Sequence, residues 1–162
     1  MHTIGGSDSW RAPQPTAGEL RVAAAQGVNT VLCLRKARPG RPWYEEELAT
    51  CRDLGLNFRT LDWSALKSDP EQIARLIQAL QELPPPYLIH CKHGVDRSGL
   101  AAAVFRVVAL GHKKHDAGTE LSLLNGHLSF LATGAMDEAW RNFRWPAPQP
   151  PPDDAVRVAV GP

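Results

Sequence analysis

Apolar residues recur with a helical period in several parts of the chain. Residues 16–19 and 68–71 have the sequences of capping boxes, TAGE and SDPE, and each predicts the start of a helix. The first helix is expected to run to about Gln26 and to stop at Gly27. Four apolar residues fall on one face of the second helix: Ile73, Leu76, Ile77 and Leu80. Four more stretches are helix-like: residues 44–54, 98–110, 116–125 and 136–143.

Strand patterns alternate with these helices. The segments expected to be strands are residues 28–34, 57–63 and 87–90. Residues 1–15 look irregular, and the Pro-rich residues 146–162 are expected to be an extended or disordered tail. The pattern predicts one α/β sandwich domain over residues 1–145, with a central, mostly parallel sheet of about four or five strands flanked by helices.

Composition and charge narrow the class of protein. The length of 162 residues suits one domain. The net charge of +1 does not indicate a basic surface for binding nucleic acid. The sequence contains no apolar run of about 18 residues, so no membrane span is expected. The first residues lack a signal-peptide pattern. Three cysteines, Cys33, Cys51 and Cys91, do not suggest a disulfide framework. We therefore expect a cytoplasmic protein, and a monomer.

The stretch YLIHCKHGVDRSG, residues 87–99, places a cysteine between a strand and a helix. Loops of this kind turn backbone N–H groups inward and bind anions, and the following helix adds its positive N-terminal end. Gly94 permits backbone angles that such a loop needs, and Arg97 supplies a planar fork for two oxygens of an oxyanion. The loop is therefore a predicted phosphate-binding loop.

The same field stabilises a thiolate at Cys91, whose pKa should fall below the ordinary value of a free cysteine. A thiolate that faces a bound phosphate is a nucleophile, so the predicted reaction is phosphoryl transfer to sulfur followed by hydrolysis. Nothing polar is arranged around Cys33 and Cys51 in the sequence, and we interpret both as small buried hydrophobic residues.

The segment HCKHGVDRSG resembles the HCxxGxxR(S/T)G signature of the protein tyrosine phosphatase superfamily, most closely its compact dual-specificity-like members, bacterial ones included. SWRAPQPTAGELRVAAAQGVNTVLCLR resembles the N-terminal segment of that family, and LDWSALKSDPEQIARLIQAL resembles its general-acid loop and following helix. The resemblance covers roughly residues 9–110.

The resemblance implies a role for each matching residue. Cys91 matches the nucleophile, Arg97 the phosphate-binding arginine, Ser98 the hydroxyl that assists departure of the thiolate, and His90 the histidine that supports the cysteine. The substrate-binding cradle is expected from the residues that follow the cysteine: Lys92, His93, Gly94, Val95, Asp96 and Arg97.

The general acid has two candidates. Dephosphorylation needs a proton donor for the leaving oxygen and later a base for water. Asp62 lies at the end of a predicted strand, about thirty residues before the cysteine, where the family places this acid on a mobile loop. Asp69 is the rival, although an acid in the first turn of a helix is also explained by the helix dipole. We favour Asp62 because a loop suits a catalytic acid better.

The expected activity is phosphomonoester hydrolysis without a metal or other cofactor. The substrate is expected to be a phosphorylated protein, or else a phosphoinositide, which the rim charges of Lys92 and His93 would favour. Asp96 is expected to orient the arginine or position water. Two functions of other classes stay open: a rhodanese-like sulfurtransferase and a phosphate-binding module without catalysis. A metal site built from His90, Cys91 and His93 is disfavoured, because neighbouring residues of a strand point in opposite directions.

Overall fold

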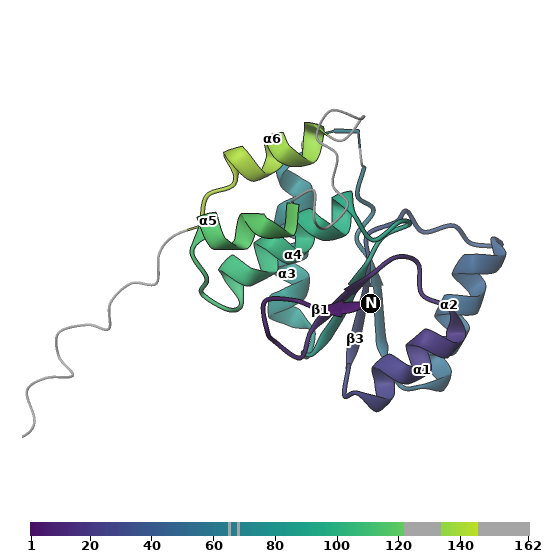
Figure 1. The fold of residues 1–162 in the computed structure, drawn as a ribbon. Helices are drawn as coiled ribbons and strands as arrows, with labels where there is room; N and C mark the ends of the chain where they lie inside the picture. The colour runs from purple at the N-terminus through teal and green to yellow at the C-terminus, as the bar shows by residue number, and fades with distance from the viewer. Residues whose placement is uncertain (65, 68, 122–133, 146–162) are drawn as a thin grey trace, which may run out of the picture.

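A central sheet organises the protein (Figure 1). The structure, a computed structural model, describes residues 1–64, 66–67, 69–121 and 134–145. Within these residues five strands form one sheet in the order β1-β2-β5-β3-β4. Only β1 runs antiparallel to its neighbour. The strands are β1 (His2–Thr3), β2 (Trp10–Ala12), β3 (Thr30–Cys33), β4 (Asn57–Thr60) and β5 (Tyr87–His90).

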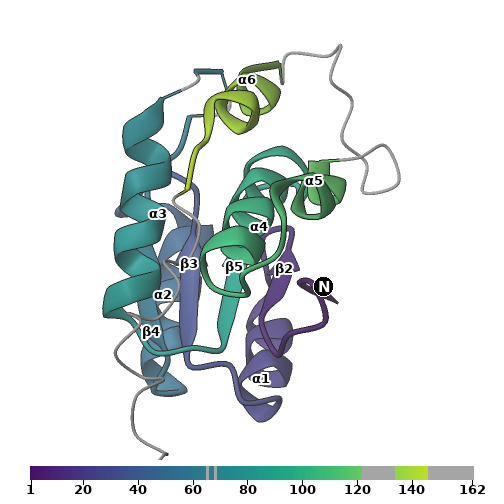
Figure 2. The ribbon, with the colours of Figure 1, turned by 90° about the vertical axis from the view of Figure 1, so that its left-hand side faces the viewer.

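Helices cover both faces of the sheet, which confirms the predicted α/β sandwich (Figure 2). One face carries α1 (Ala17–Ala25) and α2 (Pro42–Asp53), which pack over a smaller apolar core. The larger core lies under α3 (Pro70–Glu82), α4 (Asp96–Val108) and α6 (Gly134–Asn142). The short helices α5 (Lys114–Ala117) and η1 (Gly118–Leu121) pack against α4.

The middle strand β5 positions the predicted phosphate-binding loop. It is buried along its whole length and pairs in parallel with β2 on one side and β3 on the other. Because parallel strands end at the same edge, the residues after β2, β3 and β5 meet there. Open α/β sheets bind ligands at this edge, and the loop after β5 lies on it.

Several local predictions are confirmed and others need correction. Thr16 caps α1 through a complete capping box, as expected. The cap of α3 is Asp69, and Ser68 lies outside the described residues. The first fifteen residues are not irregular throughout, because residues 2–3 and 10–12 form β1 and β2. Strands of two and three residues are too short for an alternation of apolar and polar residues to be recognised, so the sequence did not predict them.

The C-terminal half is described only in part. The helix expected at 116–125 is found as α5 followed by a 3₁₀ helix, and its last four residues lie outside the described part. The predicted tail, residues 146–162, also lies outside it. None of the helices in the described ranges combines the length and the apolar character that crossing a membrane requires.

Candidate active site

The loop after β5 can close only because residue 94 is a glycine. Gly94 has a φ of 73°, in the left-handed region. A Cβ atom there would lie 2.5 Å from the backbone nitrogen of Pro13 and 2.8 Å from the carbonyl carbon of Ala12. The loop therefore packs its backbone directly against the chain that leaves β2, and any side chain at residue 94 would push the two apart.

The thiol of Cys91 lies inside this loop and is 2% exposed. The Gly94 N–H donates to Cys91 Sγ over 3.2 Å, and the hydroxyl oxygen of Ser98 lies 3.5 Å from the same sulfur. Burial alone would raise the pKa of Cys91, but hydrogen bonds from Ser98 and the charge of Arg97 outweigh it and lower that pKa. The predicted thiolate therefore has its physical causes in place.

Arg97 lies in the first turn of α4, half-buried. Its Nη1 donates to the carbonyl oxygen of Trp63 over 3.3 Å, and it forms no ion pair with a carboxylate of the described residues. The guanidinium is thus oriented by a neutral acceptor and keeps its charge for a ligand. Lys92 and His93 are exposed on the rim.

Asp62 has an unusual backbone conformation and directly precedes Trp63, whose carbonyl oxygen accepts the hydrogen bond from Arg97. Its φ is 53°, which a non-glycine residue adopts only at some cost. The amides on either side of it, those of Leu61 and Trp63, donate to the carbonyls of Cys33 (2.8 Å) and Leu34 (3.1 Å). These two bonds hold the turn, and the exposed Asp62 side chain is carried on the segment that contacts Arg97.

Asp69 has a structural task instead. Its carboxylate accepts the backbone N–H of Glu71 over 2.9 Å and caps α3. A carboxylate at this point also favours the helix dipole. The two candidates for the general acid are therefore distinguished by their surroundings: Asp69 is held in a helix cap, and Asp62 is held on a loop beside the arginine.

His90 is completely buried and is paired with an acid from α2. Its Nε2 lies 2.7 Å from Glu47 Oε1, and its Nδ1 lies 3.4 Å from the carbonyl oxygen of Cys91. Burial would lower the pKa of His90, but contacts with Cys33 and Glu47 outweigh it and raise the pKa to about 10. A protonated imidazole therefore lies directly behind the loop at neutral pH.

The surroundings of Cys33 correct our interpretation of that residue. Its sulfur and the nearest side-chain atoms of Glu47 and His90 all lie within 4.8 Å of one another, so its surroundings are polar. Cys33 and His90 are register partners on neighbouring strands, which the sequence alone does not reveal. Within the described ranges this is the group that could hold a metal ion, yet Glu47 and His90 already pair directly. Cys51 fits our interpretation better, since burial raises its pKa to about 12.

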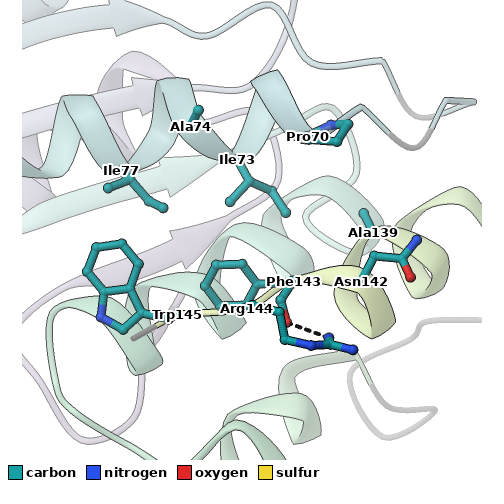
Figure 3. Close-up of a pocket in the computed structure, with 9 residues that line it drawn as sticks. All are labelled: Pro70, Ile73, Ala74, Ile77, Ala139, Asn142, Phe143, Arg144 and Trp145. Carbon is teal, nitrogen blue, oxygen red and sulfur yellow. Dashed lines mark hydrogen bonds between the residues drawn. The ribbon is translucent and has the colours of Figure 1, made fainter. Parts of the chain in front are cut away.

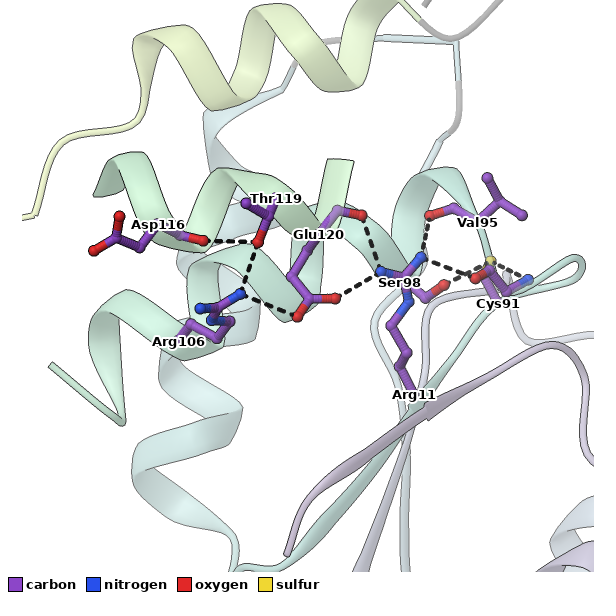
Figure 4. A network of polar contacts seen from close by, with 9 residues as sticks. Arg11, Cys91, Val95, Ser98, Arg106, Asp116, Thr119 and Glu120 are labelled. Carbon is purple, nitrogen blue, oxygen red and sulfur yellow. Dashed lines mark hydrogen bonds and ion pairs between the residues drawn. The ribbon is translucent and has the colours of Figure 1, made fainter. Parts of the chain in front are cut away.

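Arg11 holds the outer side of the loop, and sequence reasoning missed it (Figure 4). Its side chain is fully buried. Nη2 donates to the carbonyl oxygens of Gly94 and Val95, each over 3.1 Å. Carbonyls that point toward Arg11 leave the opposite side of the loop to N–H groups, which is the arrangement an anion needs. The sequence signals were the resemblance of residues 9–35 to the N-terminal segment of the family, which includes Arg11 but gave it no role, and the charge between Trp10 and Ala12.

The counter-ion of Arg11 comes from a distant part of the chain. Nη1 of Arg11 lies 2.8 Å from Glu120 Oε2 and donates to the Glu120 carbonyl over 2.9 Å. Glu120 also lies 3.4 Å from Arg106, which donates to Thr119 over 3.0 Å. Figure 4 shows this network running from the loop along α4 to η1. It ties the loop to β2 near the N-terminus and to η1 beyond α4.

An apolar hollow of about 380 Å³ lies elsewhere, between α3 and the segment that follows α6 (Figure 3). Ile73 and Ile77 line one side, and Phe143 and Trp145 the other. None of the residues from 91 to 97 lines it, so it is separate from the predicted phosphate-binding loop.

Comparison with known proteins agrees with this geometry. A model of the tyrosine phosphatase family matches residues 57–123. The dual specificity protein phosphatase TpbA of Pseudomonas aeruginosa is 28% identical over 114 residues, which are 69% of this chain and 49% of TpbA. Over these residues the chain is similar to members of the tyrosine phosphatase family. It spans about half the length of the curated relatives it matches.

Solved structures of the superfamily share the fold. The crystal structure of TpbA matches with a TM-score of 0.63 and 25% identity, over 85% of this chain and 82% of that one. TpbA carrying a cysteine-to-serine substitution, in complex with pTyr, matches with the same score over 84% and 80%. A putative phosphatase of Neisseria meningitidis shares the fold at 20% identity, with a TM-score of 0.62 over 86% and 99%.

Breaking the buried pair of Arg11 and Glu120 should lower the stability of this protein far more than breaking one of its surface pairs. Arg11→Met would leave Glu120 in a largely buried site without its closest cation, which typically costs about 3 to 5 kcal/mol. The control is Arg59→Met, which breaks an exposed pair with Glu82. Urea unfolding measures both, and equal losses would contradict the role assigned to Arg11.

The His90–Glu47 pair should make stability depend on alkaline pH. A pKa raised from 6.5 to about 10 contributes stability that is complete below pH 6.5 and is lost as the pH rises through 10. The difference in unfolding free energy between the unaltered protein and Glu47→Gln should therefore shrink from pH 7 to pH 10. Glu46→Gln, an exposed neighbour on α2, should show a pH-independent difference. A constant difference for Glu47→Gln would show that His90 is neutral.

Proposed function

We propose that this protein is a cysteine-dependent phosphatase that hydrolyses phosphomonoesters through a cysteinyl-phosphate, with phosphorylated protein as substrate. The observation that carries the proposal is the buried Cys91 thiol, 3.2 Å from an inward-pointing amide of its own loop. The TpbA relatives support the substrate class, because one is named a dual specificity protein phosphatase and one structure holds pTyr.

The first half of the reaction uses the loop and the acid. Amides of residues 92–97 and the Arg97 guanidinium hold the phosphoryl oxygens. The Cys91 thiolate attacks phosphorus, the bond to the leaving oxygen breaks, and Asp62 gives that oxygen its proton. Arg97 and the N-terminal end of α4 stabilise the charge that spreads over the phosphoryl oxygens.

The second half returns the enzyme to its starting state. Water attacks the phosphorus of the cysteinyl-phosphate while Asp62, now a carboxylate, accepts its proton. The P–S bond breaks, inorganic phosphate leaves, and the hydroxyl of Ser98 stabilises the departing thiolate. His90, pinned by Glu47, holds the backbone at Cys91. Half-buried Asp96, in the first turn of α4, orients the adjacent Arg97.

No step needs a metal ion or another cofactor, since the loop supplies its own positive charge. We assign the activity to a phosphatase domain of residues 1–145, acting as a monomer, with residues 146–162 as a tail. Cys33, Cys51 and Cys91 are all free. A reducing cytoplasm, which keeps such thiols reduced, is therefore the proposed location.

Turnover of p-nitrophenyl phosphate in the presence of EDTA tests the nucleophile and the arginine. Cys91→Ser should abolish turnover while phosphate still binds. Arg97→Lys keeps the charge and loses the fork, so it should lose far more activity than Arg59→Lys on the surface. Turnover by Cys91→Ser would rule out the mechanism, and loss of wild-type activity with EDTA followed by recovery with added metal would show a metal enzyme.

Two asparagine variants test the general acid. Asparagine tolerates a positive φ and also caps helices, so Asp62→Asn and Asp69→Asn each remove an acid with little structural change. Asp62→Asn should lower turnover of phenyl phosphate about 10²-fold or more, and that of p-nitrophenyl phosphate much less, because a good leaving group needs little proton help. Asp69→Asn should affect neither. The reverse pattern would move the acid to Asp69.

A further inference from the structure

A second arginine lies beside the phosphate-binding loop. Arg35 follows β3, whose last residue is the register partner of His90, and the Leu34 N–H donates to the His90 carbonyl over 2.8 Å. The chain at Arg35 therefore runs alongside the start of the loop. Burial lowers the pKa of Arg35, and both Arg97 and Cys91 are among the charges that act on it. Arg35 thus belongs to the electrostatic surroundings of the thiol.

The guanidinium of Arg35 is held in place before any ligand arrives. Its central carbon lies 3.4 Å from the centre of the Trp43 ring, so one face is stacked on the indole. Nη1 donates to Gln14 Oε1 over 2.6 Å. The backbone N–H of Gln14 in turn donates to the Lys92 carbonyl over 3.2 Å. The same glutamine therefore fastens Arg35 to the phosphate-binding loop.

Arg35 has no carboxylate counter-ion within the described part of the chain. Glu47 is the carboxylate whose charge acts on the pKa of Arg35, but each oxygen of Glu47 has another partner. Oε1 lies 2.7 Å from His90, and Oε2 accepts the side-chain N–H of Gln14 over 2.9 Å. A stacked, half-buried arginine without its own carboxylate keeps N–H groups and charge available for an oxyanion.

We propose that Arg35 binds a second anionic group of the substrate, on a residue that flanks the phosphorylated one. This inference rests on the proposed phosphatase function. Arg97 and the loop amides take the phosphoryl group that reacts, and Arg35 takes the carboxylate of an acidic side chain or a second phosphate beside it. The protein is then selective for acidic or doubly phosphorylated peptide segments.

The test compares three phosphotyrosine peptides that differ only in the flanking residue: asparagine, aspartate or phosphoserine. The aspartate and phosphoserine arms distinguish the two sources of the anion. Each kcat/KM is divided by the same variant's value for phenyl phosphate, so that changes in the chemistry cancel. The unaltered protein should prefer the two anionic peptides over the asparagine peptide. In Arg35→Gln the ratio of their normalised kcat/KM values should fall about tenfold, the usual scale of one charge-assisted hydrogen bond.

Two matched variants sharpen the result. Arg38→Gln removes an exposed charge three residues away and should keep the preference. Arg35→Lys keeps the charge but loses the planar guanidinium with its paired N–H donors. This variant should therefore retain only part of the preference for anionic peptides. Added salt should weaken the preference in the unaltered protein.

Distinct outcomes separate the two proposals. No turnover of phenyl phosphate by the unaltered protein would overturn the phosphatase function itself. Normal turnover with the same peptide preference in Arg35→Gln would overturn only the role of Arg35, which would then serve to pack Trp43. An Arg35 effect confined to a short-chain phosphatidylinositol bisphosphate, and missing from all three peptides, would also overturn the peptide proposal and point to a lipid substrate.

Discussion

The direction in which two backbone carbonyls point decides what the loop after β5 can do. A loop of five residues between a strand and a helix can turn either its N–H groups or its carbonyls toward the ligand. Arg11 attracts the carbonyls of Gly94 and Val95, and the close approach of Gly94 to Pro13 keeps the loop against the sheet edge. The amide at Gly94 is then free to point at the sulfur of Cys91.

This orientation depends on a buried charge, which explains the extent of the network behind it. A buried guanidinium is costly unless its charge is neutralised and its N–H groups are bonded. Glu120 supplies the charge, and the carbonyls of the loop and of Glu120 accept the hydrogen bonds. On the other face of the sheet, His90 and Glu47 form a second buried pair behind the same loop. The site is therefore braced from two sides by pairs of opposite charge.

Local features of the sequence predicted much of the site. The strand at residues 87–90 and the nest that follows it are encoded by neighbouring residues, so reading them needed no knowledge of tertiary contacts. Arg11 could not be recognised in this way, because its partner Glu120 is 109 residues away. The polar surroundings of Cys33 depend on the register of two strands, and the left-handed backbone of Asp62 depends on hydrogen bonds to β3 and the residue after it. Such features arise only when the sheet is assembled.

The match to the family begins at residue 57, yet the loop's supports lie before it. A fragment with only residues 57–123 would contain every residue predicted to act in the chemistry. It would lack β2 and β3, the two strands between which β5 is held, and with them Arg11, Gln14 and Glu47. The segment that the family model matches is therefore shorter than the segment that must fold to form the loop. The shortest fragment able to form the loop must begin before β2, although the first forty residues contribute no atom to the proposed bond-making steps.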